Sequence, residues 1–277
     1  LDVGSWIAGP VAATIMADYG AEVIKIEMPG VGDQYRLLSE TPGVPDADAN
    51  YCWQMDARNK RSLTLNLKRA EGIAILRQLV EASDVYITNQ PLPMRRALGL
   101  NYEDIQAINP AIIYASLTAY GEKGPDRDGE GFDLVAYWAR SGLMDLVRDA
   151  GAKPAMALPG MGDHPTAVSL YASIVTALLH RERTGEGSMV HTSLLGNGLW
   201  SAACIAQAGF AGGDYERYRA FKAEAGFGRF LYECQDGRFV QLTMIRTQEE
   251  FEQFLAVTQL TSVVTDPRFL TPELRIA

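Results

Sequence analysis

An acidic residue at the expected start of a long helix is the strongest candidate for chemistry in this sequence. Asp163 follows Gly162 and precedes His164-Pro165-Thr166, after which apolar residues recur at helical spacing. An aspartate here commonly caps a helix by accepting hydrogen bonds from first-turn amides, and a first-turn proline fits that pattern. The alternative is that the helix N-terminus lowers the pKa of Asp163, so that its carboxylate stays ionised and acts as a nucleophile.

Other catalytic patterns are incomplete. Gly30 and Gly32 form a G-x-G after an expected strand, but a dinucleotide fingerprint needs its glycines to open a helix, and prolines surround these. The three histidines, His164, His180 and His191, have spacings that fit no zinc motif. The sequence has no GxSxG motif and no cysteine with an evident base. These patterns therefore do not favour hydride transfer, metal chemistry, or a serine or cysteine nucleophile.

Positive charges gather at both ends of one expected strand. Asn59-Lys60-Arg61 precedes the strand and Lys68 ends it, in a chain that is acidic as a whole. Two explanations stay open, because such charges can be solvated strand ends or can hold the phosphates of a cofactor.

Composition narrows the classes of partner. The 277 residues are 47% hydrophobic, which is enough to bury a sizeable core. The 25 basic and 34 acidic residues give a formal net charge of −9, which argues against nucleic acids and anionic membranes as partners. Apolar runs are too short for a membrane span, no leader pattern opens the chain, and three scattered cysteines form no disulfide framework. We therefore expect a cytoplasmic protein.

The elements that must position Asp163 alternate between strand and helix in the first half of the chain. Strands separated by amphipathic helices predict a mostly parallel sheet with helices on both faces, a doubly wound α/β fold. The expected strands are 1–3, 21–27, 62–67, 84–89 and 111–118, and the expected helices are 9–19 and 69–82, followed by two shorter ones.

The pattern changes in the second half. A helix is expected near 133–146, and a longer one runs from Asp163 to Gly185. Residues 229–235 and 238–244 read as strands joined by Asp236-Gly237, the dipeptide preferred in a type I′ hairpin, and 248–257 reads as a helix. We place a large domain at 1–200 and the start of a linker and small α+β domain at 201–277. The longer helix is expected to pack an apolar stripe on the core, formed by Val168, Tyr171, Ala172, Val175, Leu178 and Leu179.

In their order along the chain, these pieces resemble the class III CoA-transferases, the family of formyl-CoA transferase and carnitine CoA-transferase that also contains α-methylacyl-CoA racemase. The likeness covers nearly all of the sequence. The matching segments are Ala8–Pro10, Ala17–Glu27, Pro29–Asp33, Asn59–Lys68, Ala82–Val85, Asn109–Pro110, Gly131–Asp133, Ser141–Met144, Gly162–Asp163, Arg183–Gly187, Asp236–Arg238 and Asp266–Phe269.

The resemblance implies a fold and an assembly. Similar proteins have a large Rossmann-like domain that binds CoA, a smaller second domain, and a homodimer in which two chains interlock. Their chains continue beyond the point where this one stops, and Leu1 is not a methionine, so we expect segments to be missing at both ends.

The resemblance also implies a chemistry, and places the family's nucleophilic aspartate at Asp163. Its carboxylate would attack an acyl-CoA thioester to give an anhydride and then an aspartyl-CoA thioester, and an incoming acid would repeat the exchange. Neighbouring backbone amides would stabilise the oxyanion, and no metal is involved. The residues that the resemblance assigns to coenzyme A are Ile7, Ala8, Met28, Leu65, Asn66, Leu67, Lys68, Asn89, Gln90, Pro91, Arg96, Phe132 and Asp133.

The sequence departs from the family pattern at two of these positions. A family arginine falls at Ala97, with Arg95 and Arg96 beside it as replacements, and the usual Asn-Phe pair reads Asn89-Gln90. The glycine-rich lid of some members has a short counterpart at 226–228, so lid closure is a further expectation.

Two alternatives to the transferase remain. Racemases of the family use a histidine before the acid at Asp133, and this chain has Phe132, which cannot accept a proton. The second alternative is a CoA-binding subunit without catalysis in a heteromeric transferase, against which the retained Asp163 argues. The sequence does not identify the acyl donor or the acceptor acid.

Overall fold

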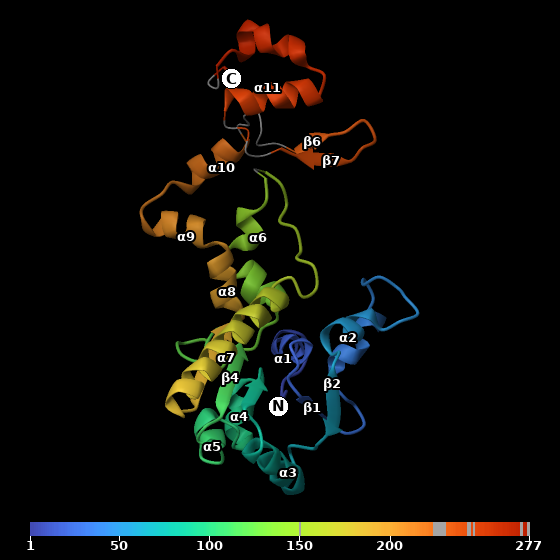
Figure 1. The fold of residues 1–277 in the computed structure, drawn as a ribbon, viewed down its shortest axis with the longest axis vertical. Helices are drawn as coiled ribbons and strands as arrows, with labels where there is room; N and C mark the ends of the chain where they lie inside the picture. Colours follow the sequence, from blue (N-terminus) through green and yellow to red (C-terminus); the bar gives the residue numbers. More distant parts are fainter. Residues whose placement is uncertain (150, 224–230, 243–244, 246, 272–273, 276–277) are drawn as a thin grey trace. The chain divides into compact units, whose positions relative to one another are not determined.

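The computed structural model describes residues 1–149, 151–223, 231–242, 245, 247–271 and 274–275. The chain forms two compact units (Figure 1). Unit 1 comprises Leu1–Arg148 and Pro154–Gln207, and unit 2 comprises Asp149–Lys153 and Ala208–Ala277. Among the described residues, no helix has the length and hydropathy needed to cross a membrane.

A parallel sheet forms the centre of unit 1. Asp2 bridges Lys25 on one side and Ile87 on the other, so the strand expected at 1–3 is present only as two isolated bridges at Asp2, between two neighbouring strands. The resulting order is β2-β1-Asp2-β3-β4-β5, with every pairing parallel. The strands are β1 (Val23–Glu27), β2 (Lys60–Thr64), β3 (Val85–Thr88), β4 (Ile113–Thr118) and β5 (Ser188–Ser193).

Helices cover both faces of this sheet, because successive strand side chains point to opposite sides. In β4, Ile113 and Ala115 pack with α1 (Ala8–Asp18) and α7 (Asp163–Thr184), whereas Tyr114 packs with α3 (Ala70–Glu81) and α5 (Tyr102–Gln106). Figure 1 shows α7 beside α1 and β4. The predicted doubly wound α/β architecture is therefore confirmed.

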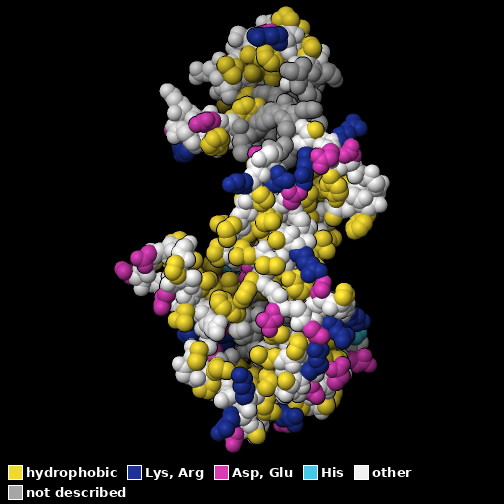
Figure 2. Space-filling model, turned by 180° about the vertical axis from the view of Figure 1, so that it is seen from behind, with side chains coloured by type: hydrophobic (Ala, Val, Ile, Leu, Met, Phe, Trp, Pro, Cys, Tyr) yellow, Lys and Arg dark blue, Asp and Glu magenta, His cyan; other side chains and the backbone are white. Residues whose placement is uncertain are grey.

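The buried face of α7 differs from the expected one. Its fully buried residues are Ala167, Leu170, Ile174 and Thr166, whereas Val168, Val175 and Leu179 of the expected stripe are 43–54% exposed. The helix has two apolar stripes, and the one with small residues packs because it lets α7 approach the sheet and α1 closely. The predicted stripe was therefore wrong for Val168, Ala172, Val175 and Leu179, whereas Leu178 packs against the core and Tyr171 stacks on Tyr19. Hydrophobic side chains are in general spread widely over the face shown in Figure 2.

The expected helix near 133–146 is also not continuous. A π-helical turn, η2 (Leu134–Ala139), is followed by Gly142 with a positive φ of 87° and then by α6 (Leu143–Leu146). Glycine adopts this φ without strain and therefore allows the chain to change direction there. The other elements of unit 1 are η1 (Gln34–Glu40), α2 (Tyr51–Asp56), α4 (Leu92–Leu98), α8 (Leu194–Ser201) and α9 (Ala203–Phe210), which extends into unit 2.

Unit 2 contains the expected hairpin and helix. β6 (Leu231–Glu233) pairs antiparallel with β7 (Phe239–Gln241). The Cys234 amide donates to the Arg238 carbonyl at 2.7 Å, so the loop consists of the three residues 235–237, of which only Gly237 has a positive φ. That is a type I turn followed by a glycine in the left-handed region, so the two-residue type I′ prediction was wrong. The other elements are α10 (Tyr215–Ala223), α11 (Gln248–Val257), η3 (Thr261–Thr265) and η4 (Pro267–Phe269).

Candidate active site

The candidate site lies where the central strands end. The strand order of the sheet reverses at Asp2. Strands β1 and β2 lie on one side of it, and β3, β4 and β5 lie on the other. In such sheets ligands bind outside the carboxyl ends of the strands at the point of reversal. The loop that joins Asp2 to α1 crosses this point, and the Asn89 side chain fixes it: Nδ2 donates to the Ser5 carbonyl at 2.7 Å and Oδ1 accepts from the Ser5 amide at 2.9 Å.

A buried cluster of charges supports the same loop. Lys25 Nζ lies 2.8 Å from Asp33 Oδ2 and 3.6 Å from Asp2 Oδ2, and Lys60 Nζ lies 2.9 Å from Asp2 Oδ2. All four side chains are at most 2% exposed. Asp33 Oδ1 also accepts from the amide of Trp6, a non-glycine residue held at a φ of 63°. The cluster therefore stabilises a strained loop conformation.

This cluster decides between the two explanations of the basic strand ends. Lys60 is buried against Asp2, and Arg61 forms an exposed ion pair with Glu22 at 2.8 Å. Neither is placed to bind phosphate. Lys68, at the other end, is exposed and has no ion pair within the described part of the chain. Of Lys60, Arg61 and Lys68, Lys68 is therefore the one left available for a ligand.

Asp163 does not cap its helix. It is the first residue of α7, the N-cap is Gly162, and no hydrogen bond to the Asp163 carboxylate occurs among the described residues. The carboxylate of Asp133 instead accepts from the Gly162 amide at 3.0 Å, and Thr166 donates its hydroxyl to the Gly162 carbonyl at 2.7 Å. The cap interpretation was therefore wrong, because the chain enters the helix one residue earlier and leaves the Asp163 carboxylate free.

The pKa of Asp163 moves in the direction opposite to that expected. Burial, followed by the negative charges of Asp133 and Asp56, raises the pKa of Asp163 to about 7, and only His164 opposes this rise. The helix N-terminus favours a carboxylate, but desolvation and two like charges outweigh it. A carboxylate with a raised pKa is a stronger base, and stronger bases are in general better nucleophiles once ionised.

Gly162 is required by the close packing around Asp163. A Cβ at Gly162 would lie 2.5 Å from Cγ of Tyr137, which is buried in η2. Any larger residue would displace the start of α7 and with it the Asp163 carboxylate. The Gly-Asp pair of the sequence is thus explained by a contact between α7 and η2.

Three residues of the site around Asp163 were not predicted as site residues from the sequence. His164 Nε2 lies 3.1 and 3.3 Å from the two carboxylate oxygens of Asp56, at the end of α2. Tyr35, in η1, donates its hydroxyl to the same carboxylate. Asp56 and Tyr35 lie far from Asp163 in the sequence, so the acid-histidine doublet Asp163-His164 was the only available signal.

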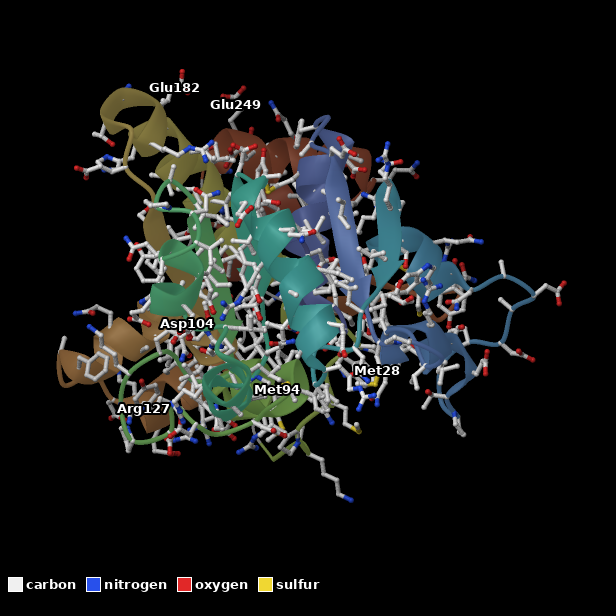
Figure 3. All side chains as sticks on the ribbon, turned by 90° about the horizontal axis from the view of Figure 1, so that it is seen from below. Met28, Met94, Asp104, Arg127, Glu182 and Glu249 are labelled. Carbon is white, nitrogen blue, oxygen red and sulfur yellow. The ribbon has the colours of Figure 1, made fainter. Side chains whose placement is uncertain are left out.

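The structure places two of the predicted CoA residues, Phe132 and Asp133, beside the loop before α1 and the start of α7. Trp6, directly before Ile7, packs its ring edge to face with Phe132 at 5.4 Å between centroids, and Phe132 precedes Asp133, which contacts Gly162. Ile7 and Ala8 are buried at the start of α1, and Met28 is 45% exposed after β1. Figure 3 shows Met28 and Met94 at one side of unit 1, with Glu182, in the last turns of α7, at the other.

The remaining predicted residues divide into two groups. Leu65 is buried directly after β2, whereas Asn66 and Lys68 are exposed and Leu67 is half-buried. Asn89, Gln90 and Pro91 follow β3 at the start of α4, where the Asn89 side chain is already bound to Ser5.

The two candidate replacements for the family arginine differ in their surroundings. Arg95 is 1% exposed and forms a buried ion pair with Glu122 at 3.0 Å, so it cannot reach a ligand at the surface. Arg96 is exposed and paired with Asp128 at 2.6 Å, an interaction that a phosphate can replace. The expected lid at 226–228 lies outside the described residues.

Comparison with known proteins decides the family. The model of CoA-transferase family III matches residues 1–277. The chain belongs to this family. Among curated members, it is 32% identical to (R)-2-hydroxy-4-methylpentanoate CoA-transferase of Clostridioides difficile over 97% of this chain and 67% of that protein. It is 35% identical to succinyl-CoA:glutarate CoA-transferase of Mus musculus over 82% of this chain and 54% of that protein.

Members of the family with solved structures share the fold. A CAIB/BAIF family protein from Brucella suis superposes with a TM-score of 0.81 at 26% identity, and the match covers 99% of this chain and 72% of that one. The chain spans about half to two thirds of the length of the curated family members it matches.

Proposed function

We propose that this family III member is a CoA-transferase that moves CoA from an acyl-CoA to a carboxylic acid, with Asp163 as nucleophile. The observation that supports this role is the state of the Asp163 carboxylate. It is half-buried at a helix start, has no hydrogen-bond partner among the described residues, and has a pKa raised to about 7. An aspartate that served the structure alone would be paired, since an unpaired carboxylate that is partly removed from water destabilises the fold.

The proposed reaction balances without a metal or an external base. An Asp163 oxygen attacks the thioester carbonyl carbon, the C–S bond breaks, and CoA leaves as thiolate from a mixed anhydride. The thiolate attacks the Asp163 carbonyl carbon of that anhydride, which forms aspartyl-CoA and releases the donor acid. The acceptor carboxylate then attacks aspartyl-CoA, and the released thiolate takes the acceptor acyl group, which regenerates Asp163.

The chain's own residues fit a CoA thioester as substrate. The exposed ammonium of Lys68 and the exposed guanidinium of Arg96 are available for phosphate groups, and Met28 offers an exposed apolar contact. Asn89 acts differently from a ligand, because both ends of its amide hold the Ser5 loop. We therefore assign it to positioning the loop before Ile7 and not to a direct contact with CoA.

The names of related proteins support the reaction class but not one substrate pair. One family member is named cinnamoyl-CoA:phenyllactate CoA-transferase, from Clostridium sporogenes, and it is 32% identical to this chain. Others are named for 2-hydroxy-4-methylpentanoate and for glutarate. These acids differ in size, charge and aromatic character, so we leave the donor and the acceptor of this protein open.

The two alternatives are disfavoured by particular residues. Phe132 stands where the racemase branch has its histidine base, and it is packed against Trp6 and has no proton to exchange. A transferase with unlike subunits has a precedent in name, since a family member at 32% identity is called a succinyl-CoA–L-malate CoA-transferase alpha subunit, from Chloroflexus aurantiacus. A subunit without catalysis would have no use for an unpaired Asp163 with a raised pKa, so this residue argues against the non-catalytic alternative.

The proposed function predicts exchange by the purified full-length protein alone. We expect it to transfer CoA between at least one donor and one acceptor from a panel of acyl-CoAs and hydroxy, dicarboxylic and aromatic acids, with products identified by mass. The rate should rise with pH through about 7, because Asp163 must lose its proton to attack. Absence of exchange with every pair would reject the transferase, and exchange only after a second polypeptide is added would favour the heteromeric alternative.

We also propose that the protein is an interlocked homodimer. Val168, Val175 and Leu179 form an exposed apolar stripe on α7 in the single chain, and such a stripe is suited to contact with a second copy. Light scattering on the full-length protein should give twice the subunit mass. A stable monomer at micromolar concentration would contradict the proposal.

A further inference from the structure

His164 stands between the nucleophile and a buried carboxylate. It follows Asp163 in the first turn of α7, and its side chain is 38% exposed, whereas that of Asp56 is 3% exposed. Both oxygens of Asp56 lie within 3.3 Å of His164 Nε2. A carboxylate can only accept hydrogen bonds, so Nε2 must carry a proton.

The surroundings of the imidazole favour its charged form. Tyr35 from η1 and Thr14 from α1 hold Asp56 in place, because the Tyr35 hydroxyl donates to the Asp56 carboxylate and the Thr14 hydroxyl donates to the Asp56 carbonyl. The hydrogen bond to Asp56 raises the pKa of His164, and the Gly160 backbone and the charge of Asp163 raise it further. A histidine whose neighbours are acceptors and anions is stabilised as imidazolium.

The charges at the site require such a cation. Three carboxylates meet here, Asp133 from η2, Asp56 from α2 and Asp163 itself, and the first two disfavour ionisation of the third. The arginine of η1, Arg36, is paired with Glu27 at 2.7 Å, and the thiol of Cys52 in α2 is buried and has a raised pKa. Of the groups that act on Asp163, His164 alone favours its carboxylate form.

We propose that His164 is a positioning residue of the transferase: held by Asp56 and Tyr35, its imidazolium supplies the positive charge that keeps the neighbouring Asp163 carboxylate ionised and nucleophilic. The inference rests on the proposed function of Asp163. It assigns the triad Tyr35-Asp56-His164 a role in setting the pH range of the reaction. No bond forms or breaks at His164.

The test is the pH profile of acyl transfer to Asp163 in His164→Gln. Glutamine keeps an N–H donor for Asp56 but has no charge. We expect the acid limb of the profile to move to higher pH by about one unit, which means about a tenfold loss at pH 6.5 and near-normal rates above pH 9. His180→Gln, the same change on an exposed residue of α7, should leave the profile unchanged. A loss of equal size at every pH would overturn the proposal and assign His164 a structural role.

Two NMR titrations test the proposal without a measurement of activity. The chain has three histidines, so the imidazole signal missing from His164→Gln identifies His164, and its midpoint should fall by about one unit in Asp56→Asn. The Asp163 carboxyl signal, identified by its absence from Asp163→Asn, should titrate at higher pH in His164→Gln. The shift of the Asp163 midpoint tests the role of His164 even if Asp56→Asn does not fold.

The outcomes separate the two proposals. An unchanged Asp163 midpoint in His164→Gln would reject the role of His164 whatever the activity. A shifted midpoint in a protein that transfers CoA with no donor or acceptor would retain the electrostatic coupling and reject the proposed function.

Discussion

Asp163→Asn should abolish CoA transfer and at the same time make the protein more stable. The amide is a poor nucleophile toward a thioester, so turnover should fall by several orders of magnitude. CoA binding should be retained, since the other predicted contacts come from other segments. Hydroxylamine with acyl-CoA should modify Asp163 in the unaltered protein and nothing at this position in the variant. Near-normal exchange by the variant would show that Asp163 is not the nucleophile.

The stability gain follows from the sign of the pKa shift. Asp163 has a pKa of about 7 in the folded protein and about 3.8 when unfolded, so the folded state holds its proton more tightly. Stability is therefore lost as pH rises from about 4 to 7, and the loss is complete above 7. Asparagine removes this loss, although its own buried amide offsets part of the gain.

We expect Asp163→Asn to be about 1 to 3 kcal/mol more stable at pH 8 and nearly equal at pH 4. Urea unfolding at the two pH values measures this. Glu182→Gln, an exposed change near the other end of the same helix (Figure 3), is the matched control and should show no such pH dependence. A variant that is equally or less stable at pH 8 would contradict the raised pKa.

Asp2→Asn should cause the largest loss of stability. Asp2 is fully buried and pairs with both Lys25 and Lys60, and removal of one member of a buried ion network leaves its partners without compensation. Among the described residues, Lys60 then has no carboxylate partner, and neutral oxygens such as the Pro10 carbonyl remain. The expected cost is about 3 to 5 kcal/mol in the free energy of unfolding.

Chemical unfolding measures this cost, and two variants serve as controls. Glu22→Gln breaks the exposed pair with Arg61 and should change stability little, because exposed ion pairs contribute little. Asp2→Asn combined with Lys60→Met should recover part of the loss, since the second change removes the uncompensated charge. If the single variant costs no more than Glu22→Gln, the buried cluster does not stabilise the loop before α1.

Much of the fold could be predicted from local patterns. α1, α3, β3 and α11 fall within about two residues of the expected ranges, because hydrophobic periodicity and helix-terminating residues are local properties. The alternation of strand and helix likewise predicted a parallel sheet covered on both faces. The hairpin of unit 2 was predicted, but its turn type was not, because Asp-Gly fits a three-residue loop as well as a two-residue one.

The sequence by itself pointed to Asp163 as the candidate nucleophile, through the family resemblance that the Gly162-Asp163 pair and the motifs around it carry. Only the tertiary structure decided the chemical state of that residue. Asp133 and Asp56 approach Asp163 from two other elements and raise its pKa, although its position at a helix start predicts the reverse. The same holds for Lys60, which reads as a surface charge and is in fact buried on Asp2. Burial and the distance between charges depend on segments that are remote in sequence, and no local pattern contains them.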